Sequence, residues 1–327
     1  MKILITGGLG FVGSNLVEYL LKYKNIKKII IVDNFSSSSI QYIEKFTKYK
    51  FFKSYNHYKK SISKVEIIKA NINNFNIAKK ITKNIDCIIH LAAESGIDKS
   101  ITDPLNAFNV NVVGTFNYLE AARINKVKQF ILASSGAVFG NQKPPFKEIY
   151  ERNPISPYGS SKLTAETFCQ TYGMTFKIQT TILRFSNAYG KYSKHKNSVI
   201  AKFINNIINS KQIVINGNGK ITRDYIYVED ICSAIYKCLQ NKKKSTIYHV
   251  STNKETSLND LIKKIEHTFN IISNSPLQIK KKYGKNRLGD MKSNSQSNNK
   301  IKKEMNWSPK TNLNQGLLKT LEWFILN

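Results

Sequence analysis

The stretch Thr6-Gly7-Gly8-Leu9-Gly10-Phe11-Val12-Gly13, near the start of the chain, decides the fold. It follows a short apolar strand predicted for residues 2–6 and precedes a segment, residues 10–22, with apolar side chains at helical spacing. Glycines at positions 7, 10 and 13 allow a tight turn and a close approach of the backbone to a phosphate. The free N–H groups at the helix start favour the same anion. This order of strand, turn and helix predicts a dinucleotide-binding domain, with a plain tight turn as the alternative.

A carboxylate, Asp33, ends the second predicted strand, residues 28–32. At this place in a dinucleotide-binding domain, a carboxylate accepts hydrogen bonds from the ribose hydroxyls of the adenosine. It would also repel a 2′-phosphate, and no arginine follows it directly. Asp33 therefore favours NAD over NADP as the cofactor, and a simple cap at the strand end is the alternative.

Strands and helices alternate through the first half of the chain. Further strands are predicted at 65–69, 87–91, 129–134 and 180–184, and helices at 77–83, 104–125 and 158–172. This rhythm is typical of the α/β class, here a Rossmann-type, doubly wound parallel sheet. We expect residues 1–185 to form this domain and 186–327 a smaller C-terminal α/β substrate domain, with some strands returning to the first. Residues 36–63 and 281–300 are predicted to be mostly loop, with a helix near 40–48.

The formal net charge of +30 invites a nucleic-acid interpretation, but the lysines are spread along the whole chain and no nucleic-acid-binding motif occurs. A positive surface would still attract an anionic substrate. No apolar run approaches the roughly 20 residues that span a bilayer, so no membrane contact and a soluble cytoplasmic protein are expected. No metal site is expected, because no metal-ligand spacing occurs among the cysteines, which are Cys87, Cys169, Cys232 and Cys238.

Tyr158 and Lys162 lie four residues apart, and on a helix they share one face. A free tyrosine has a pKa of about 10, and we expect the ammonium of Lys162 and a positively charged nicotinamide ring to lower it. A phenolate could then take the proton of an alcohol while hydride leaves for the ring. Ser135, at the end of a predicted parallel strand, would hydrogen-bond the reacting oxygen. A chance surface pair and a turn serine are the alternatives.

Several motifs in this order resemble the extended short-chain dehydrogenase/reductase family and, within it, the NAD-dependent nucleotide-sugar epimerases and dehydratases. The resemblance covers nearly the whole chain and is greatest to 4-epimerases of UDP-glucose and UDP-N-acetylglucosamine. The motifs are the glycine-rich turn, Asp33, HLAA at 90–93, NVVGT at 111–115, ASSGAVFG at 133–140, YGSSK at 158–162, LRFSNAYG at 183–190, RDYIYVED at 223–230 and RLGD at 287–290.

The resemblance implies a role for each motif. Tyr158, Lys162 and Ser135 would be catalytic, and Tyr158 and Ser135 would also contact the substrate. The cofactor-binding residues would be Gly7, Gly10, Phe11, Val12, Gly13, Asp33, Asn34, Asn71, Ile72, Leu91, Ala92, Ala93, Asn111, Tyr158 and Lys162.

The remaining substrate residues implied by the resemblance lie in the C-terminal part. Asn187 would meet the nucleotide diphosphate, Arg223 and Arg287 would grip its phosphates, and Asp290 would bind ribose. Asn294 would border the sugar 2-substituent, where its intermediate size suggests that N-acetyl groups are tolerated. Asn71 stands where the family often has an acid beside the adenine, and its amide oxygen could accept from the adenine amino group.

Within the resemblance, the acidic residues that this chain lacks after Ser135 indicate which reaction to expect. The family's dehydratases carry Asp-Glu directly after the catalytic hydroxyl, and its decarboxylases use a Glu in this stretch, whereas this chain has Gly136 and Ala137. The remaining set of Tyr, Lys, Ser and NAD suits 4-epimerisation of a UDP-sugar through a 4-keto intermediate. The alternatives are a nucleotide-sugar oxidoreductase or dehydratase/decarboxylase that releases a modified sugar, and a non-catalytic NAD-binding scaffold. In resembling enzymes the helices at 104–125 and 158–172 form a dimer interface, so a homodimer is expected.

Overall fold

The computed structural model describes residues 1–59, 61–241, 245–273, 279–285, 291 and 293–327. Its centre is an eight-stranded sheet in the order β12-β7-β6-β5-β1-β2-β4-β3, and every neighbouring pair is parallel. The predicted Rossmann-type doubly wound sheet is therefore confirmed. Its strands are β1 (Lys2–Thr6), β2 (Lys28–Asp33), β3 (Lys50–Phe52), β4 (Val65–Lys69), β5 (Cys87–His90), β6 (Gln129–Ser135), β7 (Gln179–Phe185) and β12 (Thr246–Val250).

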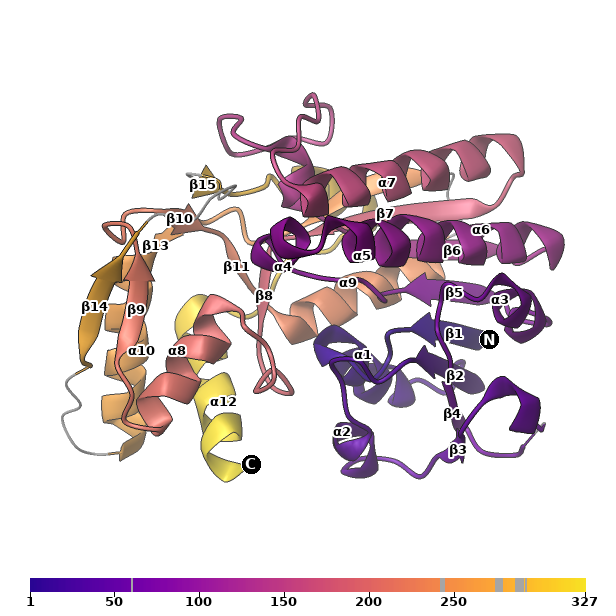
Figure 1. The fold of residues 1–327 in the computed structure, drawn as a ribbon, viewed down its shortest axis with the longest axis horizontal. Coiled ribbons are helices and arrows are strands. Elements are labelled where there is room, and N and C mark those ends of the chain that lie inside the picture. The colour runs from indigo at the N-terminus through magenta and orange to yellow at the C-terminus, as the bar shows by residue number, and fades with distance from the viewer. Residues whose placement is uncertain (60, 242–244, 274–278, 286–290, 292) are drawn as a thin grey trace.

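Helices cover both faces of this sheet, because successive side chains of a strand point to opposite faces. In β1, Ile3 and Ile5 belong to one buried cluster and Leu4 to another. Figure 1 shows helices α6 and α7 lying along one side of the sheet. The first cluster holds α1 (Phe11–Leu21), α9 (Val228–Gln240) and α11 (Asn299–Met305); the second holds α3 (Phe75–Ile81), α6 (Gly114–Ile124) and α7 (Pro157–Thr175).

The C-terminal part has a buried cluster of its own, and Figure 1 shows it beside the carboxyl ends of the sheet strands. β12 and α9 nevertheless come from beyond residue 185 and lie in the layers of the large sheet. The elements of this part are β8 (Asn187–Tyr189), α8 (Val199–Ile208), β9 (Ile213–Asn216), β10 (Thr222–Arg223), β11 (Tyr225–Tyr227), β13 (Thr256–Ser257), α10 (Leu258–Ser273), β14 (Lys281–Gly284), β15 (Ser293–Asn294) and α12 (Leu313–Leu326).

Three expectations about local structure need correction. The helix predicted for 104–125 is interrupted: α5 (Pro104–Phe108) and α6 are joined by a π-helical turn, Asn109–Val113. In the segment 36–63, the helix expected near 40–48 is the short α2 (Gln41–Glu44), and the described residues add a 3-10 turn (Tyr55–His57) and β3 at the sheet edge. The segment 281–300 includes β14, β15 and the start of α11. Short strands were missed because two to four residues carry too little periodicity to reveal them.

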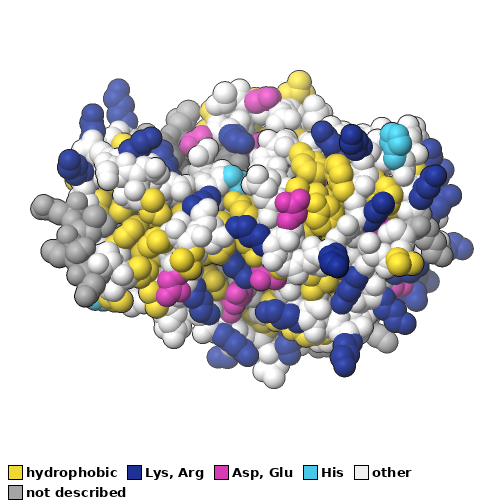
Figure 2. Space-filling view, turned by 90° about the horizontal axis from the view of Figure 1, so that it is seen from below, with side chains coloured by type: hydrophobic (Ala, Val, Ile, Leu, Met, Phe, Trp, Pro, Cys, Tyr) yellow, Lys and Arg dark blue, Asp and Glu magenta, His cyan; other side chains and the backbone are white. Residues whose placement is uncertain are grey.

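The cysteines pack in the protein interior, and the positive charge is dispersed over the visible surface. All four cysteines are buried and free. Figure 2 shows lysines and arginines scattered over the visible face, without a single basic patch over one element. Within the described part of the chain, no helix is long and apolar enough to cross a membrane. Nor do its described His, Cys, Asp and Glu side chains form a group of three that could hold a metal ion.

Candidate active site

The glycine-rich turn has the geometry that a dinucleotide phosphate requires. Gly7 has a φ of +67°, and a Cβ there would lie 2.7 Å from the backbone nitrogen of Ala92. A Cβ on Gly13 would collide with the carbonyl oxygen of Gly7. Gly10 precedes α1 and provides no side-chain cap, so the N–H groups of the first turn are available to an anion. Glycine at 7 and 13 is therefore what lets the backbone take this turn, and the free N–H groups at the start of α1 suit a pyrophosphate.

Asp33 also makes hydrogen bonds within the protein that the sequence pattern did not reveal. Its carboxylate accepts hydrogen bonds from Leu9 N at 3.1 Å, Phe35 N at 2.9 Å and Ser38 Oγ at 2.8 Å. It therefore ties the glycine-rich turn to the end of β2. A carboxylate offers about four acceptor positions, which leaves room for a ribose hydroxyl. Asn34 follows it at the surface.

The predicted adenine side is made by Asn71 and Ile72, directly after β4. Asn71 is exposed, and its Oδ1 already accepts the backbone N–H of Asn73 at 2.9 Å. Ile72 is buried against Gly114, and its carbonyl oxygen accepts from Asn117. Asn71 thus forms a local turn, and its amide oxygen has one remaining lone pair for an adenine amino group.

Asn111 holds the loop Leu91–Glu94 against α7. Its amide exchanges two hydrogen bonds with the backbone of Glu94, at 2.8 and 3.0 Å, and donates to Ser161 Oγ at 2.9 Å. Thr6 anchors the start of this loop: Leu91 N donates to the carbonyl oxygen of Thr6, and Ala92 N donates to its hydroxyl. Asn111 lies in the π-helical turn, and such turns are frequent at functional sites. Asn111 therefore positions the loop, including Ala93, that the sequence predicts to bind the cofactor.

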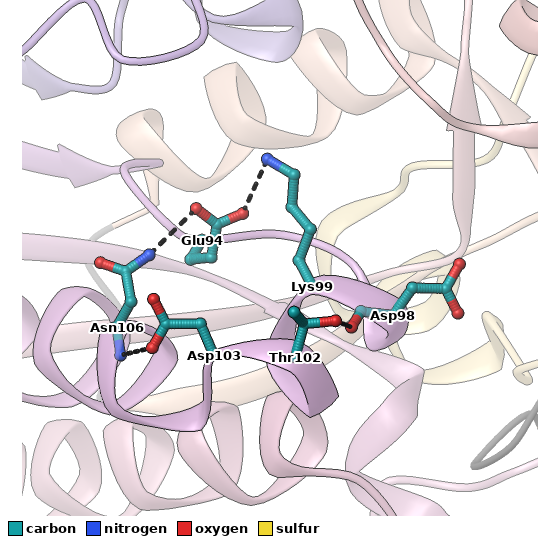
Figure 3. Close-up of a pocket in the computed structure, with 6 residues that line it drawn as sticks. All are labelled: Glu94, Asp98, Lys99, Thr102, Asp103 and Asn106. Atoms are coloured by element: carbon teal, nitrogen blue, oxygen red, sulfur yellow. Dashed lines mark hydrogen bonds and ion pairs between the residues drawn. The ribbon is translucent and has the colours of Figure 1, made fainter.

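A cavity of about 340 Å³ adjoins this loop, lined by residues of the loop, α4 (Ile97–Thr102) and α5. Figure 3 shows Glu94 between Lys99 and Asn106, with its carboxylate 3.2 Å from the ammonium and 3.3 Å from the amide. None of Ser135, Tyr158 and Lys162 lines this cavity. It therefore lies beside the predicted catalytic group rather than over it.

The predicted catalytic residues meet as expected. Ser135 ends β6, its hydroxyl accepts from Ala137 N, and it lies near enough to the Tyr158 hydroxyl to lower the pKa of that phenol. Lys162, one turn further along α7, is 5% exposed and donates to the carbonyl oxygen of Ala133 at 3.0 Å. The carboxyl end of β6 and the first turn of α7 therefore bring a serine, a tyrosine and a lysine to one place.

The expected acidity of Tyr158 is not found in the protein alone. Burial raises the pKa of Tyr158, and the nearby Ser135 side chain opposes this rise only in part. Burial also lowers the pKa of Lys162 to about 8, although Glu166 counteracts it. Without cofactor, burial therefore dominates the pKa of Tyr158, and the lowering expected from Lys162 together with a bound nicotinamide ring stays a prediction. Any further lowering has to come from the bound cofactor.

Sequence reasoning missed a buried ion pair beneath this group. Glu166 is one turn after Lys162 in α7, and its carboxylate accepts from Arg184 Nε at 2.9 Å and Arg184 Nη2 at 2.7 Å. Ser134 Oγ donates to the same carboxylate at 2.5 Å. Both charged side chains are almost fully buried. Glu166 lies four residues after Lys162, a spacing that places both on one helix face and that could have drawn attention to it.

Strand register brings the C-terminal motifs together. β10 pairs with β15 so that Arg223 lies opposite Asn294, and β11 pairs with β8 so that Tyr225 lies opposite Asn187. Asn187 donates to the carbonyl oxygen of Asp224 through its backbone N–H and its amide. Arg223 donates to the carbonyl oxygen of Thr222 at 2.7 Å. The other two predicted substrate residues, Arg287 and Asp290, lie outside the described residues.

Asp224, next to Arg223, is buried and will make stability depend on pH. It accepts from Thr252 N and Oγ1 and from Asn253 N, yet burial dominates and raises the pKa of Asp224 to about 6. The difference from an unfolded carboxyl corresponds to about 3 kcal/mol, present below the unfolded pKa and lost as pH rises through the folded pKa.

We therefore expect the free energy of unfolding to gain from Asp224 as pH falls from about 7 to about 4. Chemical denaturation of wild type and Asp224→Asn across this range will measure it, and the difference between their pH slopes isolates the single carboxyl. Equal slopes would contradict the prediction.

Two side-chain amides, those of Asn294 and Gln296, occupy the space beside Gly136, the residue after Ser135. A Cβ on Gly136 would lie 2.9 Å from Asn294 Oδ1 and 3.0 Å from Gln296 Nε2. Gln296 is fully buried and was not singled out in the sequence. Its segment was expected to be loop, so nothing in the local pattern indicated a contact with β6. The C-terminal part thus fills the space where a side chain at 136 would stand.

The fold, the glycine cradle and the Ser135–Tyr158–Lys162 group define an extended short-chain dehydrogenase/reductase. A model of the family described as GDP-mannose 4,6 dehydratase matches residues 4–320. The chain therefore belongs to this family of nucleotide-sugar epimerases and dehydratases, and its cofactor is NAD.

Relatives with either activity match over nearly the full length. A putative UDP-glucose 4-epimerase of Methanocaldococcus jannaschii is 31% identical, over 98% of this chain and 97% of the relative. A dTDP-glucose 4,6-dehydratase of Haemophilus influenzae is 30% identical, over 100% and 98%. The crystal structure of UDP-glucuronic acid 4-epimerase from Bacillus cereus, in complex with UDP-glucuronic acid and NAD, has a TM-score of 0.86 at 26% identity, over 100% and 99%.

Proposed function

We propose that the protein is an NAD-dependent epimerase that inverts C4 of a UDP-sugar through a transient 4-keto intermediate. The observation that carries this proposal is the closed position after Ser135. A 4,6-dehydratase needs acids there to move protons at neighbouring sugar carbons, whereas Gly136 and Ala137 have no ionisable side chain. The contacts of Gly136 with Asn294 and Gln296 also leave no room for an acid from this strand.

Different residues of the chain serve the individual steps of this proposed reaction. Bound NAD would accept the C4 hydride and return it. Tyr158 takes the proton of the sugar 4-hydroxyl and gives one back to the keto oxygen, while Ser135 holds that oxygen by a hydrogen bond. Lys162, held by Ala133, supports the phenolate charge. We propose that residues 1–185 hold the cofactor, and that residues 186–327 hold the nucleotide through Asn187, Arg223, Arg287 and Asp290.

A panel of UDP-sugars tests the proposal. The purified protein is incubated without added NAD with UDP-glucose, UDP-galactose, their 2-acetamido forms and UDP-glucuronate, and the C4 epimers are separated by chromatography. We expect an epimer mixture, approached from either side, without accumulation of NADH. Stoichiometric NADH would indicate a net oxidoreductase, and a dehydrated keto sugar would indicate a dehydratase; either result contradicts the proposal.

We further propose that Asn294 admits a 2-acetamido group. The residue lies at the edge of the closed position, against Gly136, and is smaller than an aromatic side chain. The comparison of wild type with Asn294→Tyr on the 2-acetamido substrates measures this tolerance. Equal turnover of these substrates by both proteins would contradict the proposed tolerance.

Introducing an acid at position 136 should disturb the packing of the site and should not create dehydratase activity. We expect Gly136→Asp to lower epimerase kcat/KM at least tenfold and to form no dehydrated product, because its Cβ would push against Asn294 and Gln296. Chromatography of the products from UDP-glucose and dTDP-glucose checks both parts. Ala137→Ser, a small polar change at the next residue, serves as the control. A dehydrated product from Gly136→Asp would contradict the steric argument.

We propose that the protein is a homodimer that pairs through α5, α6 and α7. These helices expose large apolar side chains, and the rings of Phe116 and Phe168 lie edge to face, 5.3 Å apart, across α6 and α7. Exposed apolar surface of this kind marks an interaction site. The set comprises Leu105, Phe108, Phe116, Phe168 and Met174.

The double variant Phe116→Glu/Phe168→Glu should be monomeric, because four charges would face each other across a two-fold interface. Light scattering after size exclusion measures the mass. Ile149→Glu, at a more exposed apolar residue outside these helices, is the control and should keep the wild-type mass. A monomeric wild-type protein would contradict the proposed pairing.

A further inference from the structure

One segment of the C-terminal part, residues 191–196, reaches back to α1, the helix that follows the glycine-rich turn; we call this segment the strap. Asn15 Nδ2 donates to the carbonyl oxygen of Lys191 at 2.9 Å. The ammonium of Lys191 lies 2.7 Å from the carboxylate of Glu18, and the Tyr192 hydroxyl donates to the same carboxylate at 3.0 Å. The strap is therefore tied to the helix whose first N–H groups suit a pyrophosphate.

The ring of Tyr192 also joins the strap to α2 and α12. Its centroid lies 4.9 Å from that of Tyr42 in α2 and 5.4 Å from that of Trp323 in α12, and the rings of Tyr42 and Trp323 lie 5.6 Å apart. Figure 1 shows α12 and α2 near each other in the lower part of the view. Tilted and edge-to-face rings at such separations attract each other. Three rings from three distant segments of the chain thus form one cluster.

The far end of the strap is bound to the loop after β5. Lys196 Nζ donates to Ser95 Oγ at 2.9 Å, and Ser95 lies two residues after Ala93. Within the strap, Lys196 N donates to the carbonyl oxygen of Ser193 at 2.8 Å, so Lys196 closes a turn. The strap therefore ends against the loop that the sequence predicts to bind the cofactor.

The backbone of Tyr192 is held in an unfavourable conformation. Its φ is +64°, in the left-handed region that large side chains rarely adopt. The residue is nevertheless buried, and it makes both ring contacts and the hydrogen bond to Glu18. A conformation of this kind persists only where the surrounding contacts enforce it. We therefore expect the strap to leave this conformation once those contacts are lost.

Three segments that the sequence predicts to hold NAD are thereby tied to one strap. The first is α1 with its glycine-rich turn, and the second is the loop that ends before Ser95. The third runs from Asp33 to α2, and the Asp33 carboxylate accepts from Ser38 Oγ shortly before α2 begins. A cofactor held between these segments leaves when one of them moves outward, and each such movement has to break a strap contact.

We propose that the strap is a latch that retains NAD, so that the cofactor dissociates only after the strap has separated from α2, α12 and Ser95. The open form is a minor state, and its population limits the rate at which the cofactor leaves. Weakening a strap contact destabilises the closed form and raises this rate. The inference goes beyond the proposed reaction, because it concerns the lifetime of the bound cofactor. Retention suits an epimerase, which regenerates NAD in every cycle.

The dissociation rate of NADH, the reduced form of the same cofactor, tests the latch without any sugar. Protein loaded with NADH is mixed in a stopped-flow instrument with a large excess of NAD, and the fluorescence of bound NADH is followed as it decays. We expect Trp323→Ala to raise the rate at least about fivefold, because the ring contacts with Tyr42 and Tyr192 are both lost. Lys196→Met, which loses the hydrogen bond to Ser95, should raise it at least about threefold.

A matched control separates the latch from a general loss of packing. Tyr236→Ala removes a half-buried ring that stacks on Tyr23 at 3.6 Å, away from the strap, and should keep the wild-type rate. Lys196→Met changes a side chain that is partly accessible to solvent, so it keeps the test if Trp323→Ala does not fold. A wild-type rate in Lys196→Met, or an equal rise in Tyr236→Ala, would overturn the proposal. Because no sugar is present, a failure to epimerise is a separate result.

Discussion

Replacing Tyr158 with phenylalanine is expected to lower kcat for C4 epimerisation by about 10²–10⁴-fold, the range that a positioned general acid–base contributes. The variant loses one hydroxyl, which lies near Ser135 at the end of β6, and keeps the ring. The glycine cradle and Asp33 do not depend on this hydroxyl. The affinity for NAD should therefore stay close to that of wild type, and the loss should appear in kcat.

A matched change in the same helix separates chemistry from packing. Tyr172→Phe removes a hydroxyl that donates to Glu120 at 3.0 Å, away from Ser135, and should leave kcat within about twofold. Because burial raises the pKa of Tyr158, wild-type kcat/KM in the absence of other titrations should rise toward alkaline pH, and Tyr158→Phe should lose this rise. A Tyr158→Phe protein with near-normal kcat would refute the proposed proton transfer.

Replacing Arg184 with methionine is expected to lower the free energy of unfolding by about 3–5 kcal/mol. Arg184 and Glu166 form a buried bidentate pair, with side-chain exposures of 0% and 1%. Removing the guanidinium leaves the carboxylate buried, with the hydroxyl of Ser134 as its one remaining donor among the described residues. The guanidinium also lies over the ring of Phe139 at 4.8 Å, so some packing is lost as well.

The double variant Arg184→Met/Glu166→Leu distinguishes an unpaired charge from lost packing. We expect it to be more stable than Arg184→Met, because an apolar pair of similar volume leaves no buried charge. Urea unfolding followed by circular dichroism measures the three proteins. Arg123→Met, which removes the exposed partner of Glu120, should be indistinguishable from wild type. If the double variant is as unstable as the single one, the charge of Glu166 is not the cause.

Much of the site could be predicted from sequence because its determinants are local. The glycines at 7, 10 and 13 act within one turn, so their spacing alone predicts the cradle. Tyr158 and Lys162 are four residues apart on one helix, and helical geometry alone places them on one face. Alternating strands and helices also predicted the parallel sheet, because chirality leaves few ways to connect them.

Only the tertiary structure decided the features that join distant segments. Gln296 and Asn294 lie against Gly136, and Glu166 pairs with Arg184, although no repeat or spacing links these residues. The pKa of Tyr158 also depends on how the surrounding elements bury it, and this burial raises the pKa in the chain without cofactor. Local periodicity determines which elements form and which face each one buries. Which side chains then share a buried space depends on how the elements pack, and that space decides the proposed chemistry.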